Sequence, residues 1–211
     1  ELLRLRAVHR TDQQRSRDLQ VHVAERGDDF LTHAHVGVTQ RHLQHADHVG
    51  SADLVGSTEL AHRLDPAGTA RLAADLERVA IDSVARADGR LVKTIGDGIL
   101  FTTPATGAAL SIAADLAGWA AGDDRLQGLR VGLSSGPVVW QDGDVHGPVV
   151  NLAARLCAAA DGGQVLVDEG FAAAHRPDGS PALVPAGELT LRGFATPVAI
   201  FTTAPSTPST H

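Results

Sequence analysis

Residues 91–101, LVKTIGDGILF, decide the fold class, because they place a glycine-rich turn between two strongly apolar segments. Glycine adopts the positive φ angles that a tight turn between antiparallel strands requires, so Gly96, Asp97 and Gly98 predict a β-hairpin. A hairpin interrupts the strict alternation of strands and helices that a doubly wound sheet needs. It does not explain Lys93, a charged residue within the first of the two apolar segments.

The segments on either side of the hairpin predict an alternating series of strands and helices. Upstream we expect a strand at 49–55 and helices at 58–64 and 66–88. Downstream we expect a helix at 104–123, a strand at 129–136, a short strand that enters a turn within 137–144, a helix at 148–161, and strands at 164–169, 188–193 and 196–203. The order β-α-α-β-β-α-β, with further strands behind it, predicts an α/β (α+β) ferredoxin-like sandwich with additional C-terminal strands.

Composition excludes several classes of function. The net charge of -7, with no cluster of basic residues, argues against a nucleic-acid partner, since phosphate neutralisation needs clustered Lys and Arg. No apolar run approaches the roughly 18 residues of a membrane span. The single cysteine, Cys157, cannot form an internal disulfide, and no segment resembles a signal peptide. We therefore expect a soluble protein in a reducing, cytoplasmic setting.

Residues 1–47 differ from the rest of the chain. They are rich in His, Arg and Gln and follow neither a helical nor a strand period, so we interpret them as a disordered or non-native segment. Residues 49–203 read as one globular domain, and 204–211 as a disordered tail. The chain lacks Met, so we expect it to begin inside a longer reading frame.

The predicted first strand carries His48 and Ser51 where a central strand would have large apolar side chains. Two explanations stay open. Either the strand is real but weakened, or the residues before about Ala52 are not the native sequence, as a frame error would produce.

Two carboxylates fall at predicted strand ends. Asp53 ends the first strand and Asp97 lies in the hairpin turn. In a ferredoxin-like sheet these two elements can be neighbours, which would bring both side chains to one edge. Mg²⁺ favours one or two protein carboxylates completed by water and substrate phosphates. Paired ions there could activate an attacking oxygen and stabilise a leaving one.

A turn of small residues, Gly56, Ser57 and Thr58, follows Asp53 and runs into a helix. Its backbone N–H groups could bind a polyphosphate. The alternative, which we favour for this segment taken alone, is that Ser57 or Thr58 is an ordinary helix N-cap.

Three more polar residues are candidates. Asn151 and Arg155 lie four apart and so on one helix face, where they could stabilise a transferring phosphoryl group. The alternative is a surface arginine and an asparagine near a helix start. Asp144, in a loop, is by itself more typical of a structural turn. Lys93 is the only lysine against 17 arginines, so either its compact ammonium is required or it survives by chance.

Four motifs in this order and spacing resemble the catalytic domain of the class III nucleotidyl cyclases. They are ADLVGSTEL (52–60), GRLVKTIGDGILF (89–101), RVGLSSGPVV (130–139) and DVHGPVVNLAARL (144–156). The resemblance covers about residues 49–202. It implies that Asp53 and Asp97 bind two Mg²⁺ or Mn²⁺ ions per site, and that Lys93 and Asp144 read the purine and select adenine over guanine.

The resemblance further implies that Asn151 orients the ribose and that Arg155 stabilises the transition state. Arg192 is a candidate for an additional phosphate contact, and the alternative is a surface charge at a strand end. It implies an adenylate cyclase of intracellular signal transduction that converts ATP to cyclic AMP and pyrophosphate. The sites would lie at a homodimer interface, with the metal aspartates from one subunit and the other residues from its partner. An upstream regulatory domain is a further expectation. The alternative is a weak or inactive cyclase-like module for nucleotide binding or dimerisation.

Overall fold

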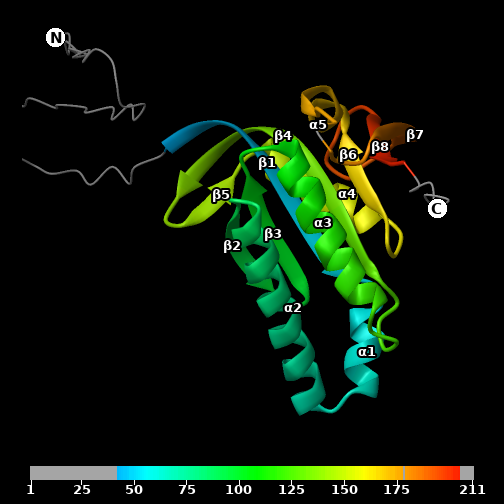
Figure 1. Cartoon of the computed structure of the whole chain (residues 1–211). Helices are drawn as coiled ribbons and strands as arrows, with labels where there is room; N and C mark the ends of the chain where they lie inside the picture. Colours follow the sequence, from blue (N-terminus) through cyan, green and yellow to red (C-terminus); the bar gives the residue numbers. More distant parts are fainter. Residues whose placement is uncertain (1–41, 178, 205–211) are drawn as a thin grey trace, which may run out of the picture.

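The computed structural model of the chain describes residues 42–177 and 179–204, and describes side chains from residue 48 onward in those ranges. One mixed sheet runs through this part of the protein, with helices on both faces (Figure 1). The strands are β1 His42–Leu54, β2 Arg90–Ile95, β3 Gly98–Thr103, β4 Leu129–Gln141, β5 Asp144–His146, β6 Val165–Asp168, β7 Leu183–Leu189 and β8 Val198–Thr203. The helices are α1 Ser57–Arg63, α2 Pro66–Arg86, α3 Thr106–Ala121, α4 Pro148–Ala159 and α5 Glu169–Ala174.

The order of the elements confirms the predicted ferredoxin-like fold. The sheet runs β2-β3-β1-β4-β6-β8-β7, and β5 pairs with β4. Strand β1 lies between β3 and β4 and is antiparallel to both. Helices α2 and α3 pack side by side on one face, whereas α4 packs against the other (Figure 1). No helix in the described ranges is long and apolar enough to cross a bilayer.

Strand β4 corrects one prediction, since it continues through Pro137 where two separate strands were expected. Proline lacks the N–H that a strand interior donates, so it normally ends or bulges a strand. Opposite Pro137 the register of β1 shifts, because Gln44 pairs with Val138 and Asp47 with Gly136. This bulge removes the need for the missing N–H and lets one long strand replace two.

Three further elements differ from the prediction. Strand β5 occupies what was predicted as a loop, and Asp144 begins it. Helix α5 was not predicted; it has only six residues, too few to show a period, and Asp168 caps it by accepting hydrogen bonds from the N–H groups of Gly170 and Phe171. Strand β7 spans 183–189 instead of 188–193, because the chain turns at Gly193, which has a φ of 92°.

The unusual residues of β1 are accommodated in a regular strand. His48 is buried, and its Nδ1 lies 2.6 Å from the hydroxyl of Ser135, its partner across the β1–β4 ladder. Its ring also meets the ring of Phe171 edge to face, with centroids 5.6 Å apart. The frame-error explanation remains a hypothesis. Of the predicted atypical segment, residues 1–41 lie outside the described residues, as does most of the predicted tail, 205–211.

Helix α4 lies directly against β4 at Gly132. A Cβ atom at this position would lie 2.2 Å from the carbonyl oxygen of Ala153 and 2.3 Å from the N atom of Cys157. Both are backbone atoms of the helix, so no side-chain rotation could relieve the clash. The absence of a side chain at Gly132 therefore sets how closely α4 approaches the sheet.

We expect Gly132→Ala to lower the free energy of unfolding by about 3 kcal/mol, because α4 must move away from the strand as a unit. Denaturant unfolding followed by circular dichroism measures the change. Gly118→Ala on α3 is the matched control, since a Cβ there meets nothing within 4 Å. That substitution should stabilise the protein slightly, by up to about 1 kcal/mol. Equal effects at the two glycines would contradict the close packing of α4.

Candidate functional site

Asp53 and Asp97 come together at one end of the sheet. Asp53 pairs with Gly98 across the β1–β3 ladder, and Asp97 is the residue before Gly98. A Cβ on Gly98 would lie 3.7 Å from Oδ1 of Asp53, so this carboxylate oxygen faces the hairpin. The expectation that the first strand and the hairpin turn are neighbours is therefore met.

The electrostatics of this pair favour a bound cation. Burial raises the pKa of Asp53, the contact with Arg130 opposes that rise, and the nearby carboxylate of Asp97 adds to it. Oδ2 of Asp97 is buried and has no hydrogen-bond partner among the described residues. A buried, unpaired carboxylate oxygen facing a second carboxylate is costly unless a positive charge is shared between them.

The residues present fit a divalent metal ion. Two carboxylates are the usual protein contribution to a Mg²⁺ site, with water and phosphate oxygens completing the octahedron. Within residues 42–177 and 179–204, no group of three or more His, Cys, Asp or Glu side chains forms a fuller metal cage.

Arg130 also belongs to this site, and it was not among the predicted residues. It lies opposite Asp53 in the β1–β4 ladder. Its Nε and Nη2 atoms donate to Oδ2 of Asp53 at 3.1 and 2.5 Å, and its Nη1 donates to the carbonyl oxygen of Ala158 at 3.2 Å. Pairing across a sheet depends on register, which a linear sequence does not display. The signal that could have found it is an arginine one residue into a predicted strand.

Lys93 and Asp144 form a second polar group in the same chain. Nζ of Lys93 lies 2.5 Å from Oδ2 of Asp144, and Oδ1 of Asp144 accepts a hydrogen bond from the N–H of Val145 at 2.8 Å. The hydrogen bond from Lys93 is the main reason that the pKa of Asp144 lies below its usual value. Asp144 therefore stays ionised at neutral pH, and the two side chains present a donor beside an acceptor.

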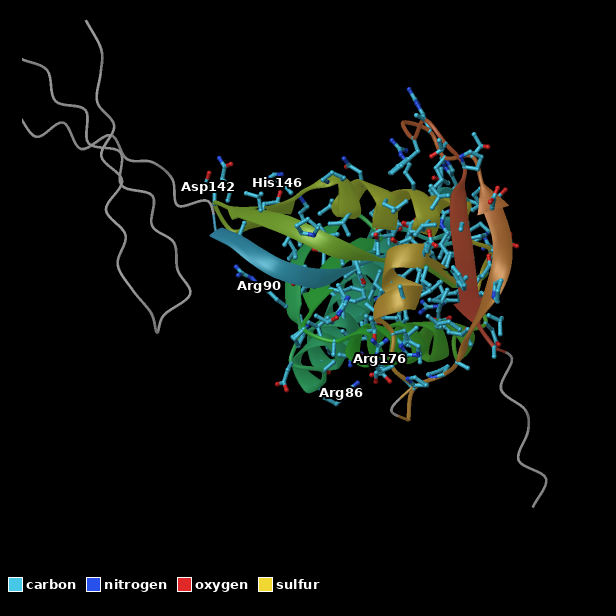
Figure 2. The ribbon with its side chains drawn as sticks, turned by 90° about the horizontal axis from the view of Figure 1, so that it is seen from above. Arg86, Arg90, Asp142, His146 and Arg176 are labelled. Atoms are coloured by element: carbon cyan, nitrogen blue, oxygen red, sulfur yellow. The ribbon has the colours of Figure 1, made fainter. Side chains whose placement is uncertain are left out.

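A cation–π contact joins β2 to the β4–β5 hairpin, the two parts of the sheet that carry Lys93 and Asp144. The guanidinium of Arg90, at the start of β2, lies 4.1 Å from the ring centroid of Trp140 near the end of β4. Figure 2 shows Arg90 on the same side of the molecule as Asp142 and His146 of the β4–β5 hairpin. The contact fixes β2 against that hairpin and supports the Lys93–Asp144 pair.

Asn151 and Arg155 project from α4 and are both exposed. The helix starts after Gly147, with Pro148 in its first turn, and buries Val149, Ala153 and the residues that follow on that face. The exposed face carries the two polar residues, as their spacing predicts. The structure thus leaves both side chains accessible from outside the subunit.

The remaining candidates are only partly as expected. Gly56, with a φ of 70°, is the N-cap of α1, and no side chain caps the helix, so the interpretation of Ser57 or Thr58 as the cap is wrong. Their binding of phosphate stays a prediction. Arg192 is exposed in the turn after β7 rather than on a strand. Its contact with phosphate likewise stays a prediction.

Cys157 lies buried beside this site. Burial raises the pKa of its thiol to about 12, so the reactive thiolate is scarce at neutral pH. Its Sγ lies 3.4 Å from the carbonyl oxygen of Arg130, a contact between α4 and β4. The residue behaves as a small apolar side chain in the packing of the helix.

Comparison with known proteins finds relatives of the chain by sequence. No family model matches the sequence. The chain is 44% identical over 124 residues to an adenylate cyclase of Streptomyces coelicolor, over 59% of this chain and 32% of that protein. It is 34% identical over 188 residues to an adenylate cyclase of Glutamicibacter nicotianae, over 89% of this chain and 45% of that protein. The chain thus spans less than half the length of these two relatives.

A solved structure shares the fold. The adenylyl cyclase CyaB from P. aeruginosa matches with a TM-score of 0.68 and 21% sequence identity, over 81% of this chain and 100% of that chain. At this identity the likeness shows a shared fold. The chain is therefore related in sequence to adenylate cyclases, and its fold is that of class III nucleotidyl cyclase catalytic domains.

Proposed function

We propose that this domain is an adenylate cyclase, which converts ATP to 3',5'-cyclic AMP and pyrophosphate. The observation that carries the proposal is the neighbouring pair of Asp53 and Asp97, in which a buried carboxylate oxygen has no hydrogen-bond partner within the described part of the chain. Mg²⁺ or Mn²⁺ bound there would lower the pKa of the ribose 3'-hydroxyl and would neutralise charge on the phosphates. The two aspartates would hold these ions beside the α-phosphate.

Base selection is assigned to Lys93 and Asp144. The Watson–Crick edge of adenine offers an acceptor at N1 and a donor at its amino group, and guanine offers the reverse. A lysine, which only donates, beside an ionised aspartate, which only accepts, complements adenine. Because Lys93 already contacts Asp144 in the described chain, little reorganisation is needed to receive the base.

Stabilisation of the transition state is assigned to two residues of α4. Arg155 would stabilise the charge that develops on the α-phosphate, and Asn151 would hold the ribose so that its hydroxyl attacks in line. Both side chains are exposed on their own subunit. This exposure supports a two-fold homodimer in which each site takes Asp53 and Asp97 from one subunit and the α4 residues from the other.

One assay tests the proposal as a whole. The full chain is incubated with ATP or GTP in Mg²⁺ and in Mn²⁺, and cyclic nucleotide is measured by chromatography. We expect cyclic AMP from ATP and little cyclic GMP. Bound ATP without any cyclic product would favour the alternative, a nucleotide-binding or dimerisation module.

Replacing Lys93 by Ala should lower the preference for ATP over GTP, taken as the ratio of their kcat/KM values, by about tenfold or more. The physical reason is that Asp144 would remain as an unpaired acceptor, suited to neither base in particular. Arg78→Ala is the charge-matched control, because Arg78 pairs with Asp75 on the exposed face of α2. An unchanged ratio in Lys93→Ala would contradict the base-reading role.

A further inference from the structure

Arg130 is held from two sides at the predicted metal site. Two of its donors converge on a single oxygen, Oδ2 of Asp53, instead of spanning both oxygens of the carboxylate. A third donor contacts the carbonyl oxygen of Ala158, in the last turn of α4. The guanidinium thus joins β4, β1 and α4, and all three contacts lie within one subunit.

The two oxygens of the Asp53 carboxylate face different groups. Oδ2 faces the guanidinium, whereas Oδ1 faces Gly98 and the hairpin that carries Asp97. One positive charge therefore lies beside two carboxylates, and the buried oxygen of the second carboxylate has no hydrogen-bond partner in residues 42–177 and 179–204. The single charge of Arg130 therefore compensates only part of the negative charge of Asp53 and Asp97.

We propose that Arg130 is a positioning residue that holds Asp53 before a metal ion binds and lowers the affinity of the site for that ion. The inference rests on the metal role proposed above for Asp53 and Asp97. A divalent cation that uses both carboxylates must share Oδ2 with the guanidinium or displace it. In either case the two positive charges repel at short range.

The contact with Ala158 gives the guanidinium a place to remain after displacement. Carbonyl groups in the last turn of a helix lack partners inside the helix and carry partial negative charge. If Nη1 stays on this carbonyl, Nε and Nη2 can turn away from Asp53 without moving the backbone. Lysine would offer only one nitrogen atom, whereas the planar fork of arginine offers three nitrogen atoms that contact the two anchors separately.

The direct test is a Mn²⁺ titration of the full chain without nucleotide, followed by electron paramagnetic resonance of free Mn²⁺. We expect Arg130→Gln to bind Mn²⁺ about tenfold more tightly than the unmodified chain, because a repelling charge is removed. Arg86→Gln is the matched control: it removes a guanidinium from another pair between two elements, with Asp115, and should leave the affinity unchanged. Unchanged or weaker binding in Arg130→Gln overturns the inference.

A second measurement uses the unmodified chain, so it does not depend on the folding of a variant. The Nε–H signal of Arg130 is followed by ¹⁵N NMR as Mg²⁺ is added, and Arg130→Lys, which lacks this group, assigns it. We expect the signal to shift and its exchange with water to accelerate at saturating Mg²⁺. An Nε–H that keeps its position and slow exchange overturns the inference.

One more variant separates this inference from the proposed function. Asp97→Asn should weaken Mn²⁺ binding in the same titration. If it does so while Arg130→Gln binds no more tightly, only the role of Arg130 is wrong. If Asp97→Asn binds as the unmodified chain does, the metal site itself is wrong and both proposals fail. A chain without cyclase activity still reports on Arg130, because no nucleotide is present.

Discussion

Asp97→Ala should lower kcat for cyclic AMP formation by at least about 1,000-fold, because the proposed metal site would lose one of its two carboxylates. The same change should not lower the melting temperature. Oδ2 of Asp97 is buried and finds no hydrogen-bond partner in the part of the chain that the structure describes. Its carboxylate also opposes ionisation of Asp53, so its removal relieves an unfavourable interaction. Cyclic AMP is measured by chromatography and the melting temperature by calorimetry.

The control for this prediction is Asp82→Ala, an exposed aspartate on α2 that faces away from the sheet. It should retain full activity. Both variants should elute at the same volume as the unmodified chain in size-exclusion chromatography, which separates loss of the site from loss of assembly. Asp97→Ala with normal turnover would refute the metal role.

Mixing two inactive variants should restore activity. Asp97→Ala lacks a metal ligand, and Arg155→Ala lacks the residue assigned to the transition state. If each site combines Asp97 from one subunit with Arg155 from the other, a mixed dimer holds one intact site and one doubly defective site. Random exchange makes about half of the dimers mixed, so an equimolar mixture should reach about a quarter of the unmodified specific activity.

The control is a mixture of two variants that act on the same half of the site, Asp97→Ala with Asp53→Ala. Each chain then lacks a metal ligand, so no mixed dimer contains an intact site and no recovery is expected. Recovery only in the first mixture supports shared sites. Absence of recovery after subunits have been exchanged under mild denaturant and refolded would instead place each site within one subunit.

The parts of the fold predicted from sequence are those encoded locally. The turn at Gly96–Gly98 and the apolar periods of α2, α3 and α4 lie within short segments, so they could be read without knowledge of the sheet. The meeting of Asp53 and Asp97 followed from a single topological step, the pairing of β1 with β3. Family resemblance supplied the roles of Lys93 and Asp144, which residue spacing alone left open.

The parts that were missed depend on contacts between distant segments. The continuity of β4 through Pro137 rests on a bulge in another strand, and the pairing of Arg130 with Asp53 rests on register between strands 77 residues apart in the chain. Strand β5 is three residues long, too short for any period to reveal it. Such features are set by tertiary packing, which overrides local preference.

Lys93, which contacts Asp144, can be labelled selectively by a reagent that reacts with amines. Lys93 carries the only side-chain amine of the sequence, and 39% of its side-chain surface is exposed. An amine-directed acylating reagent would therefore mark one side chain in the chain, at the position assigned to base recognition. Acylation would convert the ammonium into a neutral amide, and a bound adenine nucleotide would shield it. The rate of that modification thus becomes a direct reporter of nucleotide occupancy.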